Sequence, residues 1–348
     1  MNSNWEIARK IQQDLKRVEA QVGQDVVKLY RQAYAEMERD IGRFLVRFTR
    51  EDGTITALDL EWARRTIDLQ GQLRKVLEDF GEQVDNLTSR QVQSVALKHL
   101  ESYAGSMEAI LPPGMAISFD KLWPDVITSI LNRKVQGLHF SERLGVIAPE
   151  VAGAMMDQLA IGAARGESIP QMRNRLMRTA DISRYRAELI SRTEVIRASN
   201  EAASWTYAQY EGVIKKKRRM ATLDDRTCVA CLAQDGEEYP LEAMMDDHPM
   251  GRCVFAAVTP TWQELGYDLP EPPVVRRARD PYSGENILVK FQDARSWFSS
   301  QSQDVQIRMM GRTRWRLWKD GLVDWKHLYG SGSAITPVQD LKNISGEF

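Results

Sequence analysis

Residues 5–48 read WEIARKIQQDLKRVEAQVGQDVVKLYRQAYAEMERDIGRFLVRF. Apolar side chains recur in this stretch at steps of three and four residues: Ile7, Ile11, Leu15, Val18, Val22, Val26, Leu29, Ala33, Met37, Ile41 and Phe44. Such spacing places one apolar stripe along a single helix. The stretch therefore predicts one long amphipathic helix that buries one of its faces.

Two further stripes follow in the first half of the chain. The first comes after the turn signal Asp52-Gly53, and the second begins near Thr88-Ser89, which are good N-cap residues. Their apolar positions are Leu58, Ala63, Ile67, Leu73, Leu77 and Phe80, then Val92, Val95, Leu97 and Leu100. Pro112-Pro113-Gly114 ends the second stripe. Long helices with short connections predict an antiparallel bundle.

The middle of the chain also predicts helices, at 124–132, at 148–164, from about Pro170, and over 182–211. Gly166 and Gly212 are suitable helix stops, and Ser168 is a suitable cap. After Gly212 the pattern changes to short β-like pieces at 217–223, 238–240 and 253–258. Residues 269–284 are rich in Pro, Arg and Asp and predict an extended linker. Short helices are expected at 293–299, 303–319 and 336–342.

The predicted fold class is mainly α. An N-terminal helical bundle (1–147) precedes a small α+β zinc-binding module (148–268), and a linker with short C-terminal helices (269–348) completes the chain. The 348 residues are 43% hydrophobic, which suffices for a sizeable core. The net charge of −1 gives no global attraction to DNA or membrane. We find neither a signal peptide nor an uninterrupted membrane span, and expect assembly in the cytosol without a membrane partner.

The cysteines of the chain lie in one short segment. Cys228 and Cys231 form a CxxC pair, His248 follows after sixteen intervening residues, and Cys253 comes next. Two close ligands from one turn and two from another are typical of structural zinc sites. Thiolates favour zinc or iron over magnesium or calcium. The spacing therefore predicts a zinc site, with a redox pair and unligated core cysteines as the alternatives.

Several motifs in order resemble the phage Mu F-like, SPP1 gp7-like minor head protein family. The helix around Arg192-Thr193-Glu194 and Arg197 resembles the family's RTE helix, and Asp224-Asp225-Arg226-Thr227-Cys228-Val-Ala-Cys231 resembles its D-x-R-T-C-x-x-C element. The chain continues with Asp235-Gly236, Tyr239-Pro240 and the closing His248-Pro249-Met250-Gly251-Arg252-Cys253. The likeness covers about residues 150–258. Gly251 replaces the first cysteine of the closing pair, which leaves Cys228, Cys231, His248 and Cys253 as the ligands.

The resemblance implies a minor capsid or head morphogenesis protein of a tailed bacteriophage. Such a protein is located in the virion head near the portal, after assembly in the host cytoplasm. The implied partners are the portal protein, the scaffold or major capsid protein, and phage DNA. Proteins of this kind aid head assembly and DNA packaging or ejection and are not enzymes. We find no nucleotide-binding loop or hydrolase motif.

Two other groups of residues have functional and ordinary interpretations. Glu194 is a candidate catalytic acid of an ADP-ribosyltransferase-like enzyme. The favoured interpretation is a structural ion pair that docks its helix on the zinc module. Arg197 lies three residues further along the same helix and can pair with Glu194. The basic run Lys215, Lys216, Lys217, Arg218 and Arg219 is a candidate DNA contact. A solvated strand edge is the ordinary interpretation of such a run. The aromatic set Trp297, Phe298, Trp315, Trp318 and Trp325 predicts core or partner packing.

Overall fold

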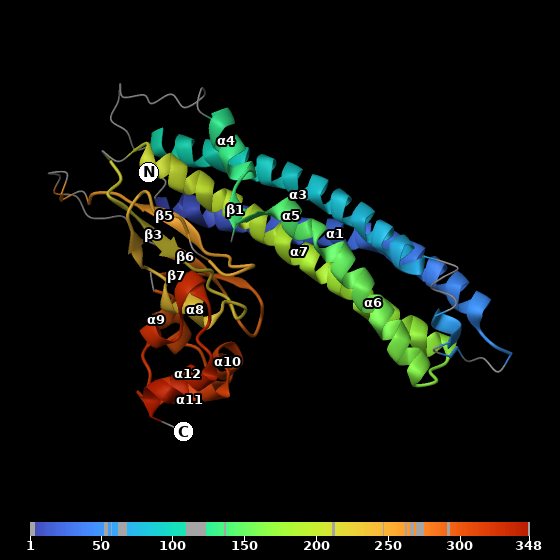
Figure 1. Cartoon of the computed structure of the whole chain (residues 1–348). Helices are drawn as coiled ribbons and strands as arrows, with labels where there is room; N and C mark the ends of the chain where they lie inside the picture. Colours follow the sequence, from blue (N-terminus) through green and yellow to red (C-terminus); the bar gives the residue numbers. More distant parts are fainter. Residues whose placement is uncertain are drawn as a thin grey trace. The chain divides into compact units, whose positions relative to one another are not determined.

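The computed structural model describes residues 4–51, 55–56, 58–61, 68–108, 123–135, 137–210, 213–245, 247–261, 263–264, 268, 275–290 and 293–346. These residues are mainly helical, as predicted, and Figure 1 labels their elements. The predicted turns at Asp52-Gly53 and Pro112-Pro113-Gly114, and the helix stop at Gly212, lie outside the described residues.

The chain folds into two compact units, each built from separated segments. Unit 1 comprises Met1–Arg17, Gln93–Ile130 and Ile196–Phe348, and unit 2 comprises Val18–Val92 and Leu131–Val195. Three long helices contribute residues to both: α1 (Asn4–Phe48), α3 (Leu69–Glu108) and α7 (Ile169–Ala208). The domain boundaries predicted after residues 147 and 268 divide the chain into consecutive segments, and they stay a prediction.

Unit 2 is helical and fits the predicted bundle. It contains α5 (Phe140–Gly145), α6 (Ile147–Ala164) and the short strands β1 (Lys134–Val135) and β2 (Leu138–His139) besides parts of the long helices. The apolar stripe of α1 is buried as expected, with Met37 and Ile41 fully inside. Tyr30 of α1 meets Phe80 of α3 edge to face at 5.6 Å, and α6 lies alongside α7 (Figure 1).

The predicted helix boundary at Thr88-Ser89 is wrong, because α3 runs through it without a break. Thr88 is fully buried, and its hydroxyl lies 2.7 Å from the carbonyl oxygen of Val84 and 2.8 Å from the Ser191 hydroxyl of α7. A threonine can therefore satisfy its hydroxyl within a helix as well as at its N-terminus.

The helices predicted from Pro170 and over 182–211 are a single helix, α7. Ser168 precedes it, and its backbone N–H donates to the side chain of Gln171 at 2.8 Å, which gives the expected cap. Gly166 has a φ of +64° and ends α6, as predicted. The helix predicted at 124–132 is α4 (Trp123–Leu131).

The strands of unit 1 follow the end of α7. Strands β3 (Lys216–Met220), β4 (Glu238–Tyr239) and β5 (Val254–Val258) form an antiparallel sheet in the order β4-β3-β5. Lys217 is opposite both Tyr239 and Ala257 in the register. Helix α8 (Val229–Ala233) lies between β3 and β4 in the chain. These strands confirm the three predicted β-like pieces.

The predicted extended linker is wrong for its described part. Strands β6 (Val275–Arg279) and β7 (Asn286–Lys290) form an antiparallel hairpin. Its turn is closed by Asp280, whose carboxylate accepts hydrogen bonds from the backbone of Tyr282 and Ser283, and Gly284 adopts a φ of +71°. Such an Asx turn is a standard hairpin device that the Pro and Arg content of the segment obscures.

Short helices complete the chain: α9 (Ala294–Ser299), α10 (Gln303–Met310), α11 (Arg312–Lys319) and α12 (Val338–Ser345). The helix predicted at 303–319 is divided at Gly311, whose φ of +82° interrupts helical geometry. Phe298 packs edge to face with Trp318 and Trp325 at ring distances of 5.5 and 5.4 Å, so core packing explains these members of the aromatic set.

One stretch among the described residues, Phe140–Ala164, has the length and composition of a membrane-crossing helix. It spans α5 and α6, and 44% of its most apolar window is buried inside the protein. A core helix of a folded domain meets the same criteria. The sequence analysis missed this stretch because it asked for an uninterrupted apolar run.

Asp235 joins separate segments of unit 1, and its substitution is the first prediction. Its carboxylate is buried and accepts from Arg276 of β6 at 2.6 Å, from the backbone N–H of Ala221 at 2.7 Å and from that of Ala294 at 2.7 Å. Asp235→Asn turns an amide toward these donors and leaves the buried Arg276 guanidinium without its anion. We expect a loss of about 3–5 kcal/mol in the free energy of unfolding.

Denaturant unfolding measures this loss. Asp225→Asn is the matched control, since Asp225 is half-buried and its ion pair with Arg308 spans 3.8 Å. The control should change stability by less than about 1 kcal/mol. Equal effects of the two substitutions would contradict the role of Asp235.

Candidate metal centre

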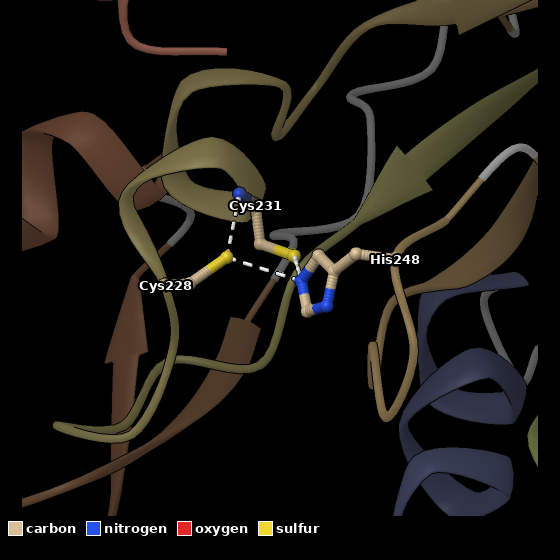
Figure 2. A group of neighbouring side chains, drawn as sticks. All are labelled: Cys228, Cys231 and His248. Carbon is tan, nitrogen blue, oxygen red and sulfur yellow. Dashed lines mark hydrogen bonds between the residues drawn. The ribbon is translucent and has the colours of Figure 1, made fainter. Parts of the chain in front are cut away.

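Cys228 and Cys231 lie at the start of α8. Cys228 is the N-cap residue of this helix, and its sulfur accepts a hydrogen bond from the backbone N–H of Cys231 at 3.4 Å. The turn thereby aims both sulfurs toward His248, whose Nε2 is 3.1 Å from the Cys228 sulfur and 3.3 Å from the Cys231 sulfur (Figure 2). The CxxC pair and His248 are therefore brought together as predicted.

The separations of these three ligand atoms fit a metal ion. Zinc bonds of about 2.3 Å to sulfur and 2.0–2.1 Å to nitrogen in a tetrahedron hold the two ligands about 3.5 Å apart. The observed distances need a change of less than about half an ångström to reach this value. Cys228, Cys231 and His248 can thus hold one ion.

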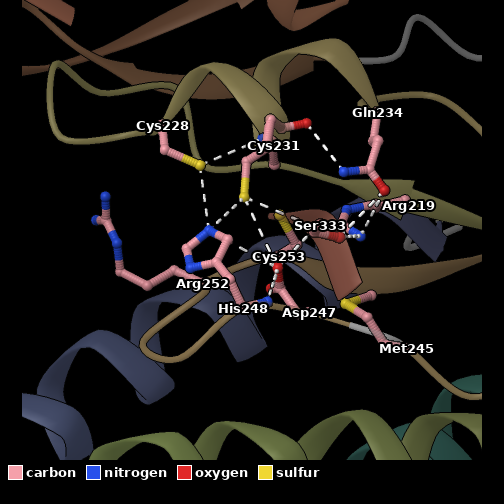
Figure 3. Close-up of polar contacts among 12 residues, drawn as sticks. Arg219, Cys228, Cys231, Gln234, Met245, Asp247, His248, Arg252, Cys253 and Ser333 are labelled. Atoms are coloured by element: carbon pink, nitrogen blue, oxygen red, sulfur yellow. Dashed lines mark hydrogen bonds and ion pairs between the residues drawn. The ribbon is translucent and has the colours of Figure 1, made fainter. Parts of the chain in front are cut away.

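Cys253 joins the cluster from the start of β5. Its sulfur, the Cys231 sulfur and a carboxylate oxygen of Asp247 all lie within 4.8 Å of one another. Cys231 and Cys253 are buried, and Cys228 is half-buried. The four predicted ligands therefore belong to two adjoining groups that share Cys231, and Asp247 belongs to the second group (Figure 3).

A tight turn orients His248. The backbone N–H of Gly251 donates to the His248 carbonyl at 2.9 Å, and Met250 has a φ of +60°, which is uncommon for a residue with a side chain. Nδ1 of His248 is 2.8 Å from the Pro249 carbonyl oxygen and serves as its donor. With Nδ1 engaged in this way, Nε2, which faces the sulfurs, is the nitrogen that a metal ion could bind after losing its proton.

The electrostatics of the cluster favour the thiolate form of Cys228 and oppose that of Cys231. Hydrogen bonds from Cys231 and then from His248 lower the pKa of Cys228 to about 4. The contact with Cys228 raises the pKa of His248 to about 9. Cys231, which faces Cys228 and Cys253, has its pKa raised well above the usual value. Three sulfurs so close together cannot all be anionic without a cation among them.

Arg219 is the protein's own cation at this place. It is 1% exposed, and its Nη2 lies 2.8 Å from Asp247 Oδ1 and 3.6 Å from the Cys231 sulfur. Burial opposes its charge, but Cys253, Asp247 and Cys231 raise the pKa of Arg219 above its usual value. Nη1 donates to Ser333 at 2.9 Å, so the C-terminal segment also supports the centre.

Asp224 fastens the closing segment to the CxxC turn. It is 1% exposed and accepts from both terminal nitrogens of Arg252, at 2.6 and 2.8 Å. Burial opposes ionisation, but the hydrogen bonds and charge of Arg252 hold the pKa of Asp224 well below its usual range. Asp224 also accepts from Thr227 at 3.0 Å. Asp224 thus connects Arg252, which precedes Cys253, with Thr227, which precedes Cys228.

The comparison with protein families identifies this region. Residues 154–256 match the family described as Phage Mu protein F like protein. This part of the chain is similar to that family, and residues 154–256 are called the Mu F-like segment below. The match confirms the resemblance seen in the sequence and supports a phage head morphogenesis protein. No curated protein and no solved structure matches the chain.

Asn200 connects the helix of the Mu F-like segment to the metal centre. Its side-chain amide donates to the Cys253 carbonyl at 3.0 Å, and both residues belong to unit 1. Further along α7, the Tyr207 hydroxyl reaches the Phe255 carbonyl at 3.4 Å. No sequence pattern pointed to Asn200, and its role is seen only from its buried position and its hydrogen bond.

The RTE residues of α7 form structural contacts. Arg192 pairs with Glu19 of α1 and, at 2.8 Å, with Glu188 of its own helix. Glu194 is 6% exposed and accepts from Arg143 of α5 at 2.7 Å.

This pair supports the structural interpretation of Glu194. The expectation that Glu194 docks α7 on the cysteine-bearing segment stays a prediction. Thr193 donates to the Leu189 carbonyl at 2.6 Å within the helix. The pairing predicted between Glu194 and Arg197 stays a prediction.

The basic run lies on β3 and alternates in burial. Lys217 and Arg219 are buried and cannot meet phosphates as placed, which corrects the expectation of five exposed charges. Lys215 pairs with Glu264 at 2.8 Å, and Glu238 pairs with Lys216 at 3.3 Å and with Arg218 at 2.5 Å. DNA contact stays a prediction for these three residues alone.

Lys217 gives a pH-dependent prediction. Its amine donates to the Ser204 hydroxyl at 2.8 Å and to the Leu241 carbonyl at 2.7 Å, and it lies 4.7 Å from the centre of the Phe255 ring. Burial lowers the pKa of this amine from 10.5 to about 8. Between these two values the unfolded chain binds more protons at Lys217 than the folded chain does, so this residue's contribution to stability rises with pH.

We expect the unfolding free energy of the natural chain to rise relative to that of Lys217→Met as pH increases from about 8 to about 10.5. Denaturant unfolding of both proteins across this range measures the difference, and other titrating groups cancel in the comparison. A difference in unfolding free energy that stays constant or falls with pH would show that burial does not lower the pKa of the Lys217 amine.

Proposed function

We propose that this protein is a minor head protein of a tailed phage whose Mu F-like segment is stabilised by a structural zinc ion. The observation that supports the proposal most is the convergence of Cys228, Cys231, His248 and Cys253 inside the segment that matches the family. The family match supports the head role, and the donor chemistry supports the metal. Association with the portal and with DNA in the head follows from the resemblance.

Zinc suits the donor set. Three sulfurs and one imidazole are soft or borderline ligands, which favour zinc over the hard cations magnesium and calcium. An ion with these four protein ligands has no open position for a catalytic water. The ligands also come from two chain segments, and binding energies of roughly 10–16 kcal/mol are available to hold such segments together. The role proposed for the ion is therefore to fold this region.

The burial of the surrounding groups agrees with a structural role. Asp224 forms an ion pair with Arg252, and Asp235 forms an ion pair with Arg276. Glu194, the residue considered for transferase chemistry, forms an ion pair with Arg143. A catalytic acid needs access to a substrate proton. We therefore propose no reaction for the chain.

Metal content tests the proposed site. The purified full chain should contain about one zinc per molecule, and Cys228→Ser or His248→Asn should lose it, because each removes one of four ligands. His327→Asn is the matched control: His327 Nδ1 accepts from the Asp324 backbone N–H at 3.0 Å, which an asparagine side chain can also do. Elemental analysis with the protein concentration determined in parallel gives the ratio. A metal-free natural chain, or full zinc in both ligand variants, would refute the site.

The location of the protein tests the head role. We expect a few copies in purified procapsids and mature heads, detected by mass spectrometry, with density near the portal in cryo-electron microscopy. His248→Asn should reduce incorporation, while His327→Asn should leave it unchanged. Heads and procapsids that lack the protein altogether would contradict the proposal.

A further inference from the structure

Asp247 lies beside the four proposed ligands and is held by only one of its oxygens. Its Oδ1 accepts from Arg219 at 2.8 Å and from the backbone N–H of His248 at 3.0 Å, and it is 3.9 Å from the Cys231 sulfur. The side chain is 9% exposed. The carboxylate is therefore buried and fixed in orientation next to two of the sulfurs (Figure 3).

The other oxygen, Oδ2, has no hydrogen-bond partner among the described residues and is shielded from solvent. A buried carboxylate oxygen without a donor or cation is costly, because its hydration is lost without replacement. One carboxylate oxygen of Asp247 and the sulfurs of Cys231 and Cys253 lie within 4.8 Å of one another. A positive ion among these three groups, reached by Oδ2 after a small rotation of the carboxylate, would satisfy that oxygen and the sulfurs together.

Gly251 makes room for this carboxylate. A Cβ atom at position 251 would lie 2.0 Å from Oδ2 and 2.2 Å from Cγ of Asp247, far closer than atoms can approach. Gly251 is not among the glycines with positive φ, so its backbone does not itself require glycine. Glycine is needed here because the Asp247 side chain occupies the space that a side chain at 251 would fill.

We propose that Asp247 is a further donor to the metal ion of this centre, through Oδ2, and that it shares the fourth coordination position with the Cys253 sulfur. The ion is then held by Cys228, Cys231 and His248 together with either of these two groups. Carboxylate oxygens bind zinc at about 2.0–2.2 Å, which is close to the lengths of zinc bonds to nitrogen and sulfur. The inference rests on the proposed metal site and extends its donor set.

Two roles of Asp247 can be distinguished: a direct bond to the metal at the position that it shares with Cys253, or only indirect support of the ligands. If Asp247 can replace Cys253, loss of either group is tolerated, and loss of both is not. If Asp247 only orients Arg219 and His248, then loss of Cys253 alone removes a ligand and the carboxylate cannot compensate. The two cases differ in how the effects of the substitutions combine.

The experiment uses the full chain loaded with Co²⁺ as a spectroscopic probe, and zinc affinity measured by competition with a chelator. Cys253→Ser should still bind one ion, with the thiolate-to-cobalt absorbance lower by about one third, since two of three thiolates remain. Asp247→Asn should keep the full absorbance. The double variant should lose more affinity than the product of the two single losses.

Gly251→Ala provides a test of Asp247 that leaves its carboxylate chemically unchanged. The added methyl group must displace the Asp247 carboxylate, so this variant combined with Cys253→Ser should lose the metal as the double variant does. Gly145→Ala is the matched control, because a Cβ there meets nothing within 4 Å. Circular dichroism of each variant verifies that the helices are retained.

The outcomes separate this inference from the proposed function. If the natural chain binds one ion but Cys253→Ser alone loses it as completely as the double variant, the role of Asp247 as a donor is refuted and the four-ligand site stands. If the natural chain binds neither Co²⁺ nor zinc, both proposals fail.

Discussion

Three sulfur atoms, an imidazole and a carboxylate lie in one buried cluster, and the neighbouring structure of unit 1 depends on how their charges are balanced. Arg219 supplies one positive charge from β3, and its contacts with Gln234 and Ser333 connect the centre to the residues after α8 and to the C-terminal segment. One guanidinium does not balance three thiolates and a carboxylate. The proposed divalent cation would supply most of the charge that is missing, which is the physical reason for proposing a metal here.

The segments around the centre are joined by several buried polar contacts. Asp224 holds Arg252 next to the CxxC turn, and Asn200 of α7 holds the carbonyl of Cys253. Each contact satisfies a group that would otherwise be buried without a partner. The ligands are thus fixed by their surroundings and do not depend on the short helix α8 alone. This arrangement suits a site whose role is to maintain a fold.

The sequence revealed those features that depend on local spacing. The CxxC pair was visible because both ligands come from one turn, and the α1 stripe because its period is helical. Asp247 and Arg219 were not recognised as parts of the centre, because one looked like an ordinary acidic loop residue and the other like a member of a charge run. Their roles depend on contacts across 28 residues of chain. The β6–β7 hairpin and the unbroken α3 were missed for a related reason, since tertiary partners decide there against local signals.

Hydrogen–deuterium exchange before and after chelation tests most directly whether a metal ion holds the cysteine-bearing part of the Mu F-like segment together. We expect that removal of the ion accelerates exchange of the amides in residues 228–233 and 247–258, while the buried amides of α6 in unit 2 keep their protection. Unchanged protection of 228–233 and 247–258 after complete removal of metal would contradict the central claim, because the segment would then be folded by its protein contacts alone.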